Sequence, residues 1–166
     1  PKWKHMGKKG GWLYPYHLAR EPIEESKEII LVESIGDCLA LYEAGLKNVL
    51  VTFGLDASSK LISYLNTFEL ERIIIATNND ENKEINSGGI ASIKAVAKIA
   101  QVFDLSIIRI NPPLCNDFGE MLESDTGGLD NFRQWHERKD KWRMNDEKFQ
   151  NYIIEQINKY EQLKKN

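Results

Sequence analysis

Four short apolar runs, rich in β-branched residues, recur along the first two thirds of the chain. They cover residues 28–32, 48–53, 72–76 and 105–110. Most of each run is continuously apolar instead of alternating with polar residues, which is typical of strands that are covered on both faces. The pattern therefore predicts four buried β-strands.

Segments with the apolar spacing of helices lie between these runs. Residues 37–44 end at Gly45, a residue type that often terminates helices, and residues 58–68 place an apolar stripe on one face. Residues 87–103 form a third such segment, with Ser87 as its N-cap. The order β-α-β-α-β-α-β with short connections predicts an α/β fold, a parallel sheet with right-handed crossovers and helices on both faces.

The parts of the chain on either side of this core differ from it. Residues 1–27 are basic and aromatic, and residues 125–166 are mostly polar. Within the latter, residues 146–163 have an apolar stripe at helical spacing, which predicts an amphipathic helix that docks on the core or on a neighbouring domain. We therefore expect an N-terminal segment (1–27), a core domain (28–124) and a C-terminal helical extension (125–166).

The composition fits a soluble globular protein. The chain has 166 residues, of which 42% are hydrophobic and 28% are charged. No apolar run is long enough to span a bilayer, and the basic N-terminus is not followed by the apolar stretch of a signal peptide, so we expect a cytoplasmic protein without membrane contact. Cys38 and Cys115 form no CxxC pair, which excludes a zinc ribbon within this chain.

The N-terminal twenty residues contain basic and aromatic side chains and no Asp or Glu, although the net charge of the chain is −3. Cations that hold phosphates beside rings that stack on bases are typical of single-strand binding. This pattern favours nucleic-acid binding through Lys2, Lys4, Lys8, Lys9 and Trp12. In the alternative interpretation, the aromatic residues form the small core of a truncated subdomain.

Acidic residues follow three of the four predicted strands. Glu33 directly follows the first strand and Asp37 lies one helical turn later, while Asp80 and Asp117 follow the third and fourth strands. The carboxyl ends of parallel strands meet at one edge of a sheet, so we expect these side chains to converge. Clustered carboxylates need a cation, and their oxygens suit Mg²⁺ or Mn²⁺. The sequence thus predicts a divalent-metal site.

The segment IILVESIGDCLALYEAGLKNVLVTFG resembles the opening of the Toprim domain of phage replicative primases and bacterial DnaG-type primases. Glu33 and Asp37 match the two acids of the family's Glu-Gly-x-x-Asp signature, in which Ser34 replaces the Gly. Gly54 matches the glycine of the turn after the second strand. The resemblance covers about residues 28–122 and implies a Toprim fold.

Two later elements of the family also match, and both depart from its pattern. Asn78 replaces the first acid of the Asp-x-Asp element that ends at Asp80, and it offers a neutral oxygen to a metal instead of a charged one. Asn116 replaces the lysine of the Lys-Asp element that ends at Asp117. The loop over residues 81–89 is longer than in the compact family pattern. It contains three side chains with compensating oxygens: Asn82, Glu84 and Asn86.

The resemblance implies a nucleotidyltransferase that makes RNA primers on single-stranded DNA from nucleoside triphosphates, with Mg²⁺ or Mn²⁺ as cofactor. It implies Glu33 as general base and a metal site formed by Asp80 and Asn78, which Asp37 and Asp117 complete as further metal residues. A replicative helicase, fused or separate, is the expected partner, since no P-loop motif occurs in the chain.

Several other interpretations stay open at this point. A non-catalytic Toprim-like module that binds nucleic acid in a replication assembly is favoured by Asn78 and Asn116. A Toprim nuclease or topoisomerase fragment and a phospho-receiver domain are further alternatives. Each acid also has a structural interpretation, as a charge or cap at the beginning of a helix or as a plain loop residue.

Overall fold

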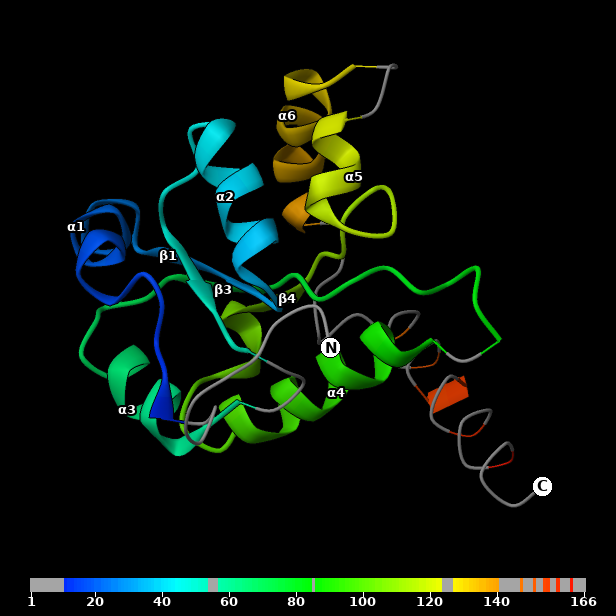
Figure 1. Cartoon of the computed structure of the whole chain (residues 1–166). Helices are drawn as coiled ribbons and strands as arrows, with labels where there is room; N and C mark the ends of the chain where they lie inside the picture. The colour runs from blue at the N-terminus through cyan, green and yellow to red at the C-terminus, as the bar shows by residue number, and fades with distance from the viewer. Residues whose placement is uncertain are drawn as a thin grey trace.

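A computed structural model of the chain places four parallel strands in one central sheet (Figure 1). It describes residues 11–53, 57–84, 86–123 and 127–140, and single positions beyond them. The strands are β1 (Glu28–Val32), β2 (Val49–Val51), β3 (Arg72–Ile75) and β4 (Ile108–Ile110). Their order is β2-β1-β3-β4, and each neighbouring pair is parallel. This confirms the predicted parallel α/β sheet.

Both faces of the sheet are buried, as the continuous apolar runs predicted. Leu31 of β1 is in register with Leu50 of β2 and Ile75 of β3, and all three belong to one hydrophobic cluster. Ile30 and its neighbour two positions later in β1 belong to a second cluster on the opposite face. Successive residues of a strand point to opposite faces, so the apolar residues of these short strands pack on one face or the other.

Among the described residues, three helices cover each face of the sheet (Figure 1). The first face packs against α1 (Tyr16–Ser26), α3 (Ser59–Leu65) and α4 (Ser87–Ile99). The second face packs against α2 (Ile35–Glu43), α5 (Phe118–Glu123) and α6 (Leu129–Glu137). The prediction of helices on both faces is therefore confirmed.

Helices α1 and α6 are more closely integrated with the core than the sequence indicated. Ala19 and Ile23 of α1 are fully buried against the first face. On the second face, Phe132 and Trp135 of α6 are buried with Phe118 of α5, and the rings of Phe118 and Trp135 meet edge to face with centroids 4.9 Å apart. Residues from both flanking segments thus complete the core of the sheet.

The chain around the fourth strand differs from the prediction. Residues Leu105–Ile107 form a 3₁₀-helix, η2, and only Ile108–Ile110 are a strand. The carboxylate of Asp104 accepts a hydrogen bond from the backbone N of Ser106 (2.7 Å), a local interaction that favours a turn over an extended strand. Beyond α6, residues Arg138–Asp140 form a second 3₁₀-helix, η3.

A cluster of ion pairs around the buried carboxylate of Glu28 joins α6 and η3 to the first residue of β1. The Glu28 carboxylate contacts the Nη1 atom of Arg72 (3.0 Å), the Nε2 atom of His136 (2.8 Å) and the Nζ atom of Lys139 (3.0 Å). Burial raises the pKa of Glu28, but hydrogen bonds from His136 and Lys139 and the positive charges of these side chains outweigh it and lower the pKa to about 2.

Some predicted features fall on parts of the chain outside the described residues. These are Lys2, Lys4, Lys8 and Lys9, the turn residue Gly54, and most of the amphipathic helix predicted for residues 146–163. Within the described part of the chain, no helix is both long enough and apolar enough to cross a membrane.

Candidate functional site at the carboxyl ends of β1 and β3

Strands β1 and β3 lie side by side in the middle of the sheet, and their connections leave in opposite directions. Helix α2, which follows β1, packs on one face, and α4, which follows β3, packs on the other. A crevice is expected where connections diverge in this way, at the carboxyl ends of the strands. Glu33 follows β1 at this point, and Asn78 and Asp80 follow β3.

The carboxylate of Glu33 is half-buried and contacts the backbone after β3. Its Oε2 atom accepts a hydrogen bond from the backbone N of Asn78 (3.2 Å). Burial raises the pKa of Glu33, and the negative charges of Asp37 and Asp80 raise it further, against the opposing effects of the Asn78 hydrogen bond and the Lys83 charge. The structure therefore brings Glu33, Asn78 and Asp80 together, as the sequence predicted.

Asp80 is buried and uses both of its carboxylate oxygens. Its Oδ2 atom accepts a hydrogen bond from the backbone N of Gly88 (3.0 Å), which is the second residue of α4. Its Oδ1 atom accepts one from the Nζ atom of Lys83 (2.5 Å). A carboxylate at a helix N-terminus is stabilised by the unpaired N–H groups there. Asp80 thus fixes the beginning of α4.

Gly88 allows the loop after β3 to lie directly against α4. A Cβ atom on Gly88 would stand 1.8 Å from the carbonyl oxygen of Asn78, so no larger residue fits without movement of the backbone. The hydroxyl of Thr77 donates to the Gly88 carbonyl (2.8 Å) and is within 2.5 Å of the Ser92 hydroxyl. Sequence reasoning missed Gly88, although a glycine pair at the start of a helix was the available signal.

Asp37 is committed to protein contacts. Its Oδ2 atom accepts hydrogen bonds from the backbone N (3.2 Å) and the hydroxyl (2.6 Å) of Ser34, which caps α2. Its Oδ1 atom accepts one from the backbone N of Phe118 (3.1 Å) at the start of α5. Burial raises the pKa of Asp37, against the lowering effect of these hydrogen bonds. The side chain positions the turn after β1 and α5 relative to each other.

Asp117 lies at the beginning of α5, where its Oδ1 atom accepts a hydrogen bond from the backbone N of Glu120 (2.8 Å). The loop that carries it is fastened to the loop after β3. The backbone N of Asn79 donates to the carbonyl of Asn116 (2.8 Å), and the Asn79 side chain donates to the carbonyl of Pro113 (3.1 Å). These bonds keep Asp117 at the same edge of the sheet as the residues after β3.

A divalent metal is the ligand that the sequence predicts at these side chains. In the part of the chain that the structure describes, no three or more His, Cys, Asp or Glu side chains converge in a metal-binding group. Magnesium, however, is commonly held by one or two carboxylates together with waters and substrate phosphates. Asp80 supplies one such carboxylate, with Asn78 two positions earlier, and the negative charges of both Asp80 and Glu33 act on the Lys83 ammonium. The donor set therefore fits Mg²⁺ or Mn²⁺.

The three loop side chains that were expected to add ligands are arranged differently from one another. The Oδ1 atom of Asn86 accepts a hydrogen bond from the backbone N of Gly89 (2.8 Å) and caps α4. Asn82 and Glu84 are exposed. Asn86 is therefore committed to the helix, and its oxygen is used to hold the start of α4.

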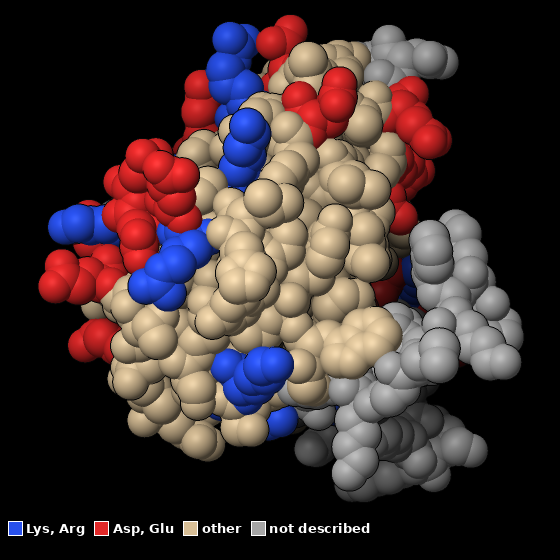
Figure 2. Space-filling model, turned by 60° about the vertical axis from the view of Figure 1, so that its left-hand side comes forward, with Lys and Arg blue, Asp and Glu red and all other residues tan. Residues whose placement is uncertain are grey.

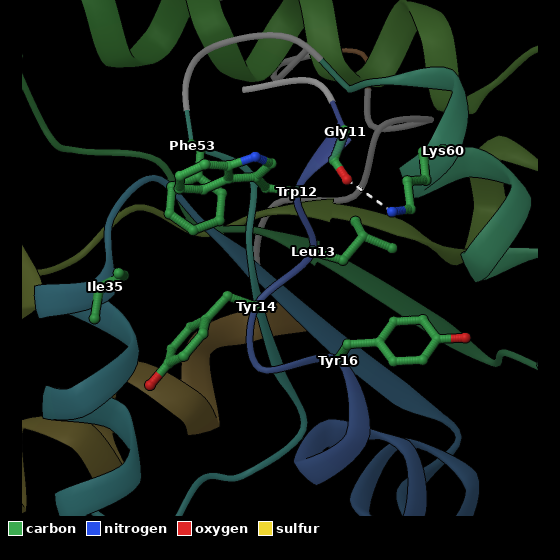
Figure 3. Close-up of a pocket in the computed structure, with 8 residues that line it drawn as sticks. All are labelled: Gly11, Trp12, Leu13, Tyr14, Tyr16, Ile35, Phe53 and Lys60. Carbon is green, nitrogen blue, oxygen red and sulfur yellow. Dashed lines mark hydrogen bonds between the residues drawn. The ribbon is translucent and has the colours of Figure 1, made fainter. Parts of the chain in front are cut away.

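An aromatic pocket of about 540 Å³ lies at the β2 edge of the sheet (Figure 3). The backbone N of Val51 in β2 donates to the carbonyl of Tyr14 (2.8 Å), which holds the N-terminal segment along this edge. The ring of Trp12 meets that of Phe53 edge to face, with centroids 5.6 Å apart. The residues that line the pocket are Gly11, Trp12, Leu13, Tyr14, Tyr16, Ile35, Phe53 and Lys60.

The position of this pocket relates it to the acidic residues. Ile35 is the first residue of α2, two positions after Glu33, and Phe53 follows the carboxyl end of β2. Trp12 is 38% exposed, so its ring is partly accessible. Sequence reasoning singled out Trp12 but missed Phe53, whose apolar character was taken only as part of a strand.

Charged side chains are unevenly spread over one face of the molecule. Figure 2 shows one face, on which uncharged residues cover much of the middle, acidic side chains gather at the left and upper margins, and basic side chains are scattered. The Lys and Arg side chains drawn on that face stand singly or beside Asp and Glu, and do not form one continuous basic stripe. The described residues on that face therefore do not form an extended basic groove.

Comparison with known proteins gives a consistent result. A family model described as "Toprim-like" matches residues 30–122. A DNA primase of Helicobacter pylori is 44% identical over 46 residues, 28% of this chain and 8% of that protein. A DNA primase of Borreliella burgdorferi is 26% identical over 127 residues, 76% of this chain and 23% of that protein. The match thus spans less than a quarter of either relative.

A solved structure shows the same fold. A DnaG primase catalytic domain bound to single-stranded DNA superposes with a TM-score of 0.58 at 18% identity, over 81% of this chain and 41% of that chain. At this level of identity the likeness concerns the fold. The structural likeness covers most of this chain and is not limited to the four strands.

Proposed function

Since this chain belongs to the Toprim-like family, we propose that it supplies the metal-dependent nucleotidyl-transfer site of a DNA primase, which makes RNA primers on single-stranded DNA. The observation that carries the proposal is the pairing of Glu33 after β1 with Asn78 and Asp80 after β3 at one crevice. The primase relatives support it, and Mg²⁺ or Mn²⁺ is the cofactor that the oxygen ligands fit.

Glu33 is the general base in this proposal. Its raised pKa makes its carboxylate a better acceptor for the proton of an attacking hydroxyl, and the N–H of Asn78 fixes the orientation of its Oε2 atom. Asp80 and Asn78 hold the metal, which when bound neutralises phosphate charge during transfer. Asp37 and Asp117 complete the site by holding the turn after β1 and the start of α5 in place.

Single-stranded DNA and nucleoside triphosphates are the proposed substrates. Trp12 and Phe53 form an accessible aromatic wall at the β2 edge of the sheet, and rings of this kind stack on bases without sequence preference. Lys2, Lys4, Lys8 and Lys9 precede this wall in the sequence and would contact phosphates. A replicative helicase, fused or separate, is the proposed protein partner, in the cytoplasm of a bacterium or of a phage-infected cell.

Primer synthesis on single-stranded template with Mn²⁺ tests the catalytic proposal, with the zinc-binding and helicase parts of a related primase supplied. Glu33→Gln should lower the rate about 100- to 10,000-fold, the usual contribution of a general base. Glu43→Gln is the matched control, because Glu43 is an exposed residue at the other end of α2. Equal rates for the two variants would refute the assignment of Glu33.

A second candidate function is a nucleic-acid-binding module without catalysis. The observation that favours it is the pair of asparagines, Asn78 and Asn116, at positions where the family has a charged residue. This module would bind single-stranded DNA but make no primer, and Asn78→Asp would restore none. Binding and synthesis, measured on the same preparations, separate the two functions.

The single-strand proposal has its own test. Oligonucleotide affinity is compared at two salt concentrations for the full chain and for a chain that begins at Gly11, which lacks the four lysines and keeps α1 intact. Removing one phosphate-binding cation should reduce the slope of log affinity against log salt by about 0.7. An unchanged affinity and slope would show that the N-terminal segment has a structural role only.

A further inference from the structure

Lys83 lies within the carboxylate cluster because the chain turns back after Asp80. The backbone N of Lys83 donates to the carbonyl of Asp80 (2.9 Å), which closes a turn. The turn brings the Lys83 side chain over the Asp80 side chain, where the ammonium contacts the Oδ1 atom. An ammonium therefore stands against the carboxylate of Asp80 in the loop after β3.

The Lys83 ammonium and a metal ion would use the same oxygen. The Oδ2 atom of Asp80 is held by the backbone N of Gly88, so Oδ1 is the oxygen left for a cation in the crevice. A divalent ion at Oδ1 would add two positive charges next to the ammonium. The two cations repel each other at this range, so one must withdraw for the other to bind.

The rest of the cluster attracts either cation. The negative charges of Glu33 and Asp117 act on Lys83 in addition to that of Asp80. The two partners of the ion pair differ in exposure, since the Lys83 side chain is 59% exposed and the Asp80 side chain 9%. Lys83 can consequently move into solvent while Asp80 keeps its position.

We propose that Lys83 is a tethered cation that holds the Oδ1 atom of Asp80 when no metal is bound and competes with a divalent metal for it. Lys83 is then a positioning residue, which keeps the acids at the carboxyl ends of β1 and β3 together in the metal-free protein. The inference rests on the proposed metal site and adds to it a residue that sets its affinity.

Calorimetric titration of the full chain with Mn²⁺ tests this inference. Lys83→Met should tighten Mn²⁺ binding about two- to fivefold, the factor that an ion pair with an exposed partner contributes to an equilibrium constant. Lys83→Arg retains the positive charge and should bind as the wild type does. Lys47→Met is the matched control and should leave the affinity unchanged. Lys47 is exposed and precedes β2, so it lies away from the carboxyl ends of the strands.

Thermal unfolding is a second measurement, and its result would not be explained by a general change in surface charge. In the presence of a chelator, Lys83→Met should unfold at a lower temperature than Lys47→Met, and saturating Mn²⁺ should close the gap because the metal then neutralises the acids. Should Lys83→Met fail to fold, Lys83→Gln keeps a polar side chain and carries the same expectations.

The outcomes for Lys83 and for the metal site are distinguishable. If Asp80→Ala abolishes Mn²⁺ binding while Lys83→Met and Lys83→Gln bind as tightly as the wild type or more weakly, the competition is refuted and the metal site stands. If Asp80→Ala binds Mn²⁺ as the wild type does, the proposed metal site is wrong and the inference about Lys83 is wrong with it.

Discussion

Gly88→Ala is expected to destabilise the protein because the added methyl group has no space. Its Cβ atom would lie 1.8 Å from the carbonyl oxygen of Asn78, and real contacts of this kind are not closer than 3.0 Å, so the loop after β3 or the start of α4 must move by about 1.2 Å. Overpacking of this kind costs about 1–3 kcal/mol. The movement also disturbs the hydrogen bonds of Gly88 to Asp80 and Thr77, which contribute about 1 kcal/mol each.

The favourable side of the substitution is smaller. Alanine is better than glycine inside a helix by about 1 kcal/mol, which leaves a net loss of about 3 kcal/mol in the free energy of unfolding. Gly36 is the matched control, since it is the second residue of α2 as Gly88 is of α4, and its added Cβ would meet only the Ser34 hydroxyl at 3.5 Å. Gly36→Ala should be neutral or stabilising.

Urea denaturation of the two variants and the wild type measures these differences. The same samples should show weaker Mn²⁺ binding for Gly88→Ala, because the backbone N that orients Asp80 has moved. If Gly88→Ala is as stable as Gly36→Ala, the close approach of Asn78 and Gly88 is not a feature of the protein in solution.

Three further changes have defined outcomes. Asn78→Asp should tighten Mn²⁺ binding about tenfold in calorimetry. This is a fraction of the several kcal/mol that a charge ~4 Å from a divalent ion contributes at an effective dielectric constant of about 20. An unchanged affinity would exclude Asn78 as a ligand. In urea denaturation, the stability advantage of the wild type over Glu28→Gln should shrink by about 2 kcal/mol between pH 5 and pH 3. The pKa of Glu28 is 4.5 in the unfolded chain and about 2 in the folded one, so its ionised form loses its contribution as the pH falls through that window. A constant difference would contradict the role of His136 and Lys139. Trp135→Ala should cost about 3–5 kcal/mol in the same measurement, and a loss below 1 kcal/mol would show that α6 does not belong to the core.

The strands and their order along the chain could be predicted because burial on both faces leaves a direct pattern in the sequence. The acids could be placed at one edge of the sheet because parallel strands put their carboxyl ends together. Helices α1 and α6 were harder, since each buries only two residues among polar ones. Ala19 and Ile23 are four positions apart, and Phe132 and Trp135 are three apart, which is the weak helical signal that was available.

The assignment of individual oxygens in the candidate site lay beyond the sequence. Whether Asp80 faces a metal or a helix depends on how the loop before α4 folds back, and the structure shows that it contacts both the helix and Lys83. Asp37 illustrates the same difficulty. Its spacing from Glu33 fits a catalytic signature, while its spacing from Ser34 fits a capping box, and the structure shows the capping box. Spacing alone does not distinguish two uses of one carboxylate.

The two hydrogen bonds of Asp80 bear on how the length of the neighbouring loop can change. The backbone N of Lys83 is bonded to the Asp80 carbonyl and that of Gly88 to the Asp80 carboxylate, so both ends of the intervening segment are attached to Asp80. Doubling the length of a flexible loop whose ends are already fixed costs only about 0.6 kcal/mol in closure entropy. Insertions after Glu84 should therefore leave Asp80 and the start of α4 in place, which makes this loop a suitable attachment point for a fluorescent reporter beside the crevice.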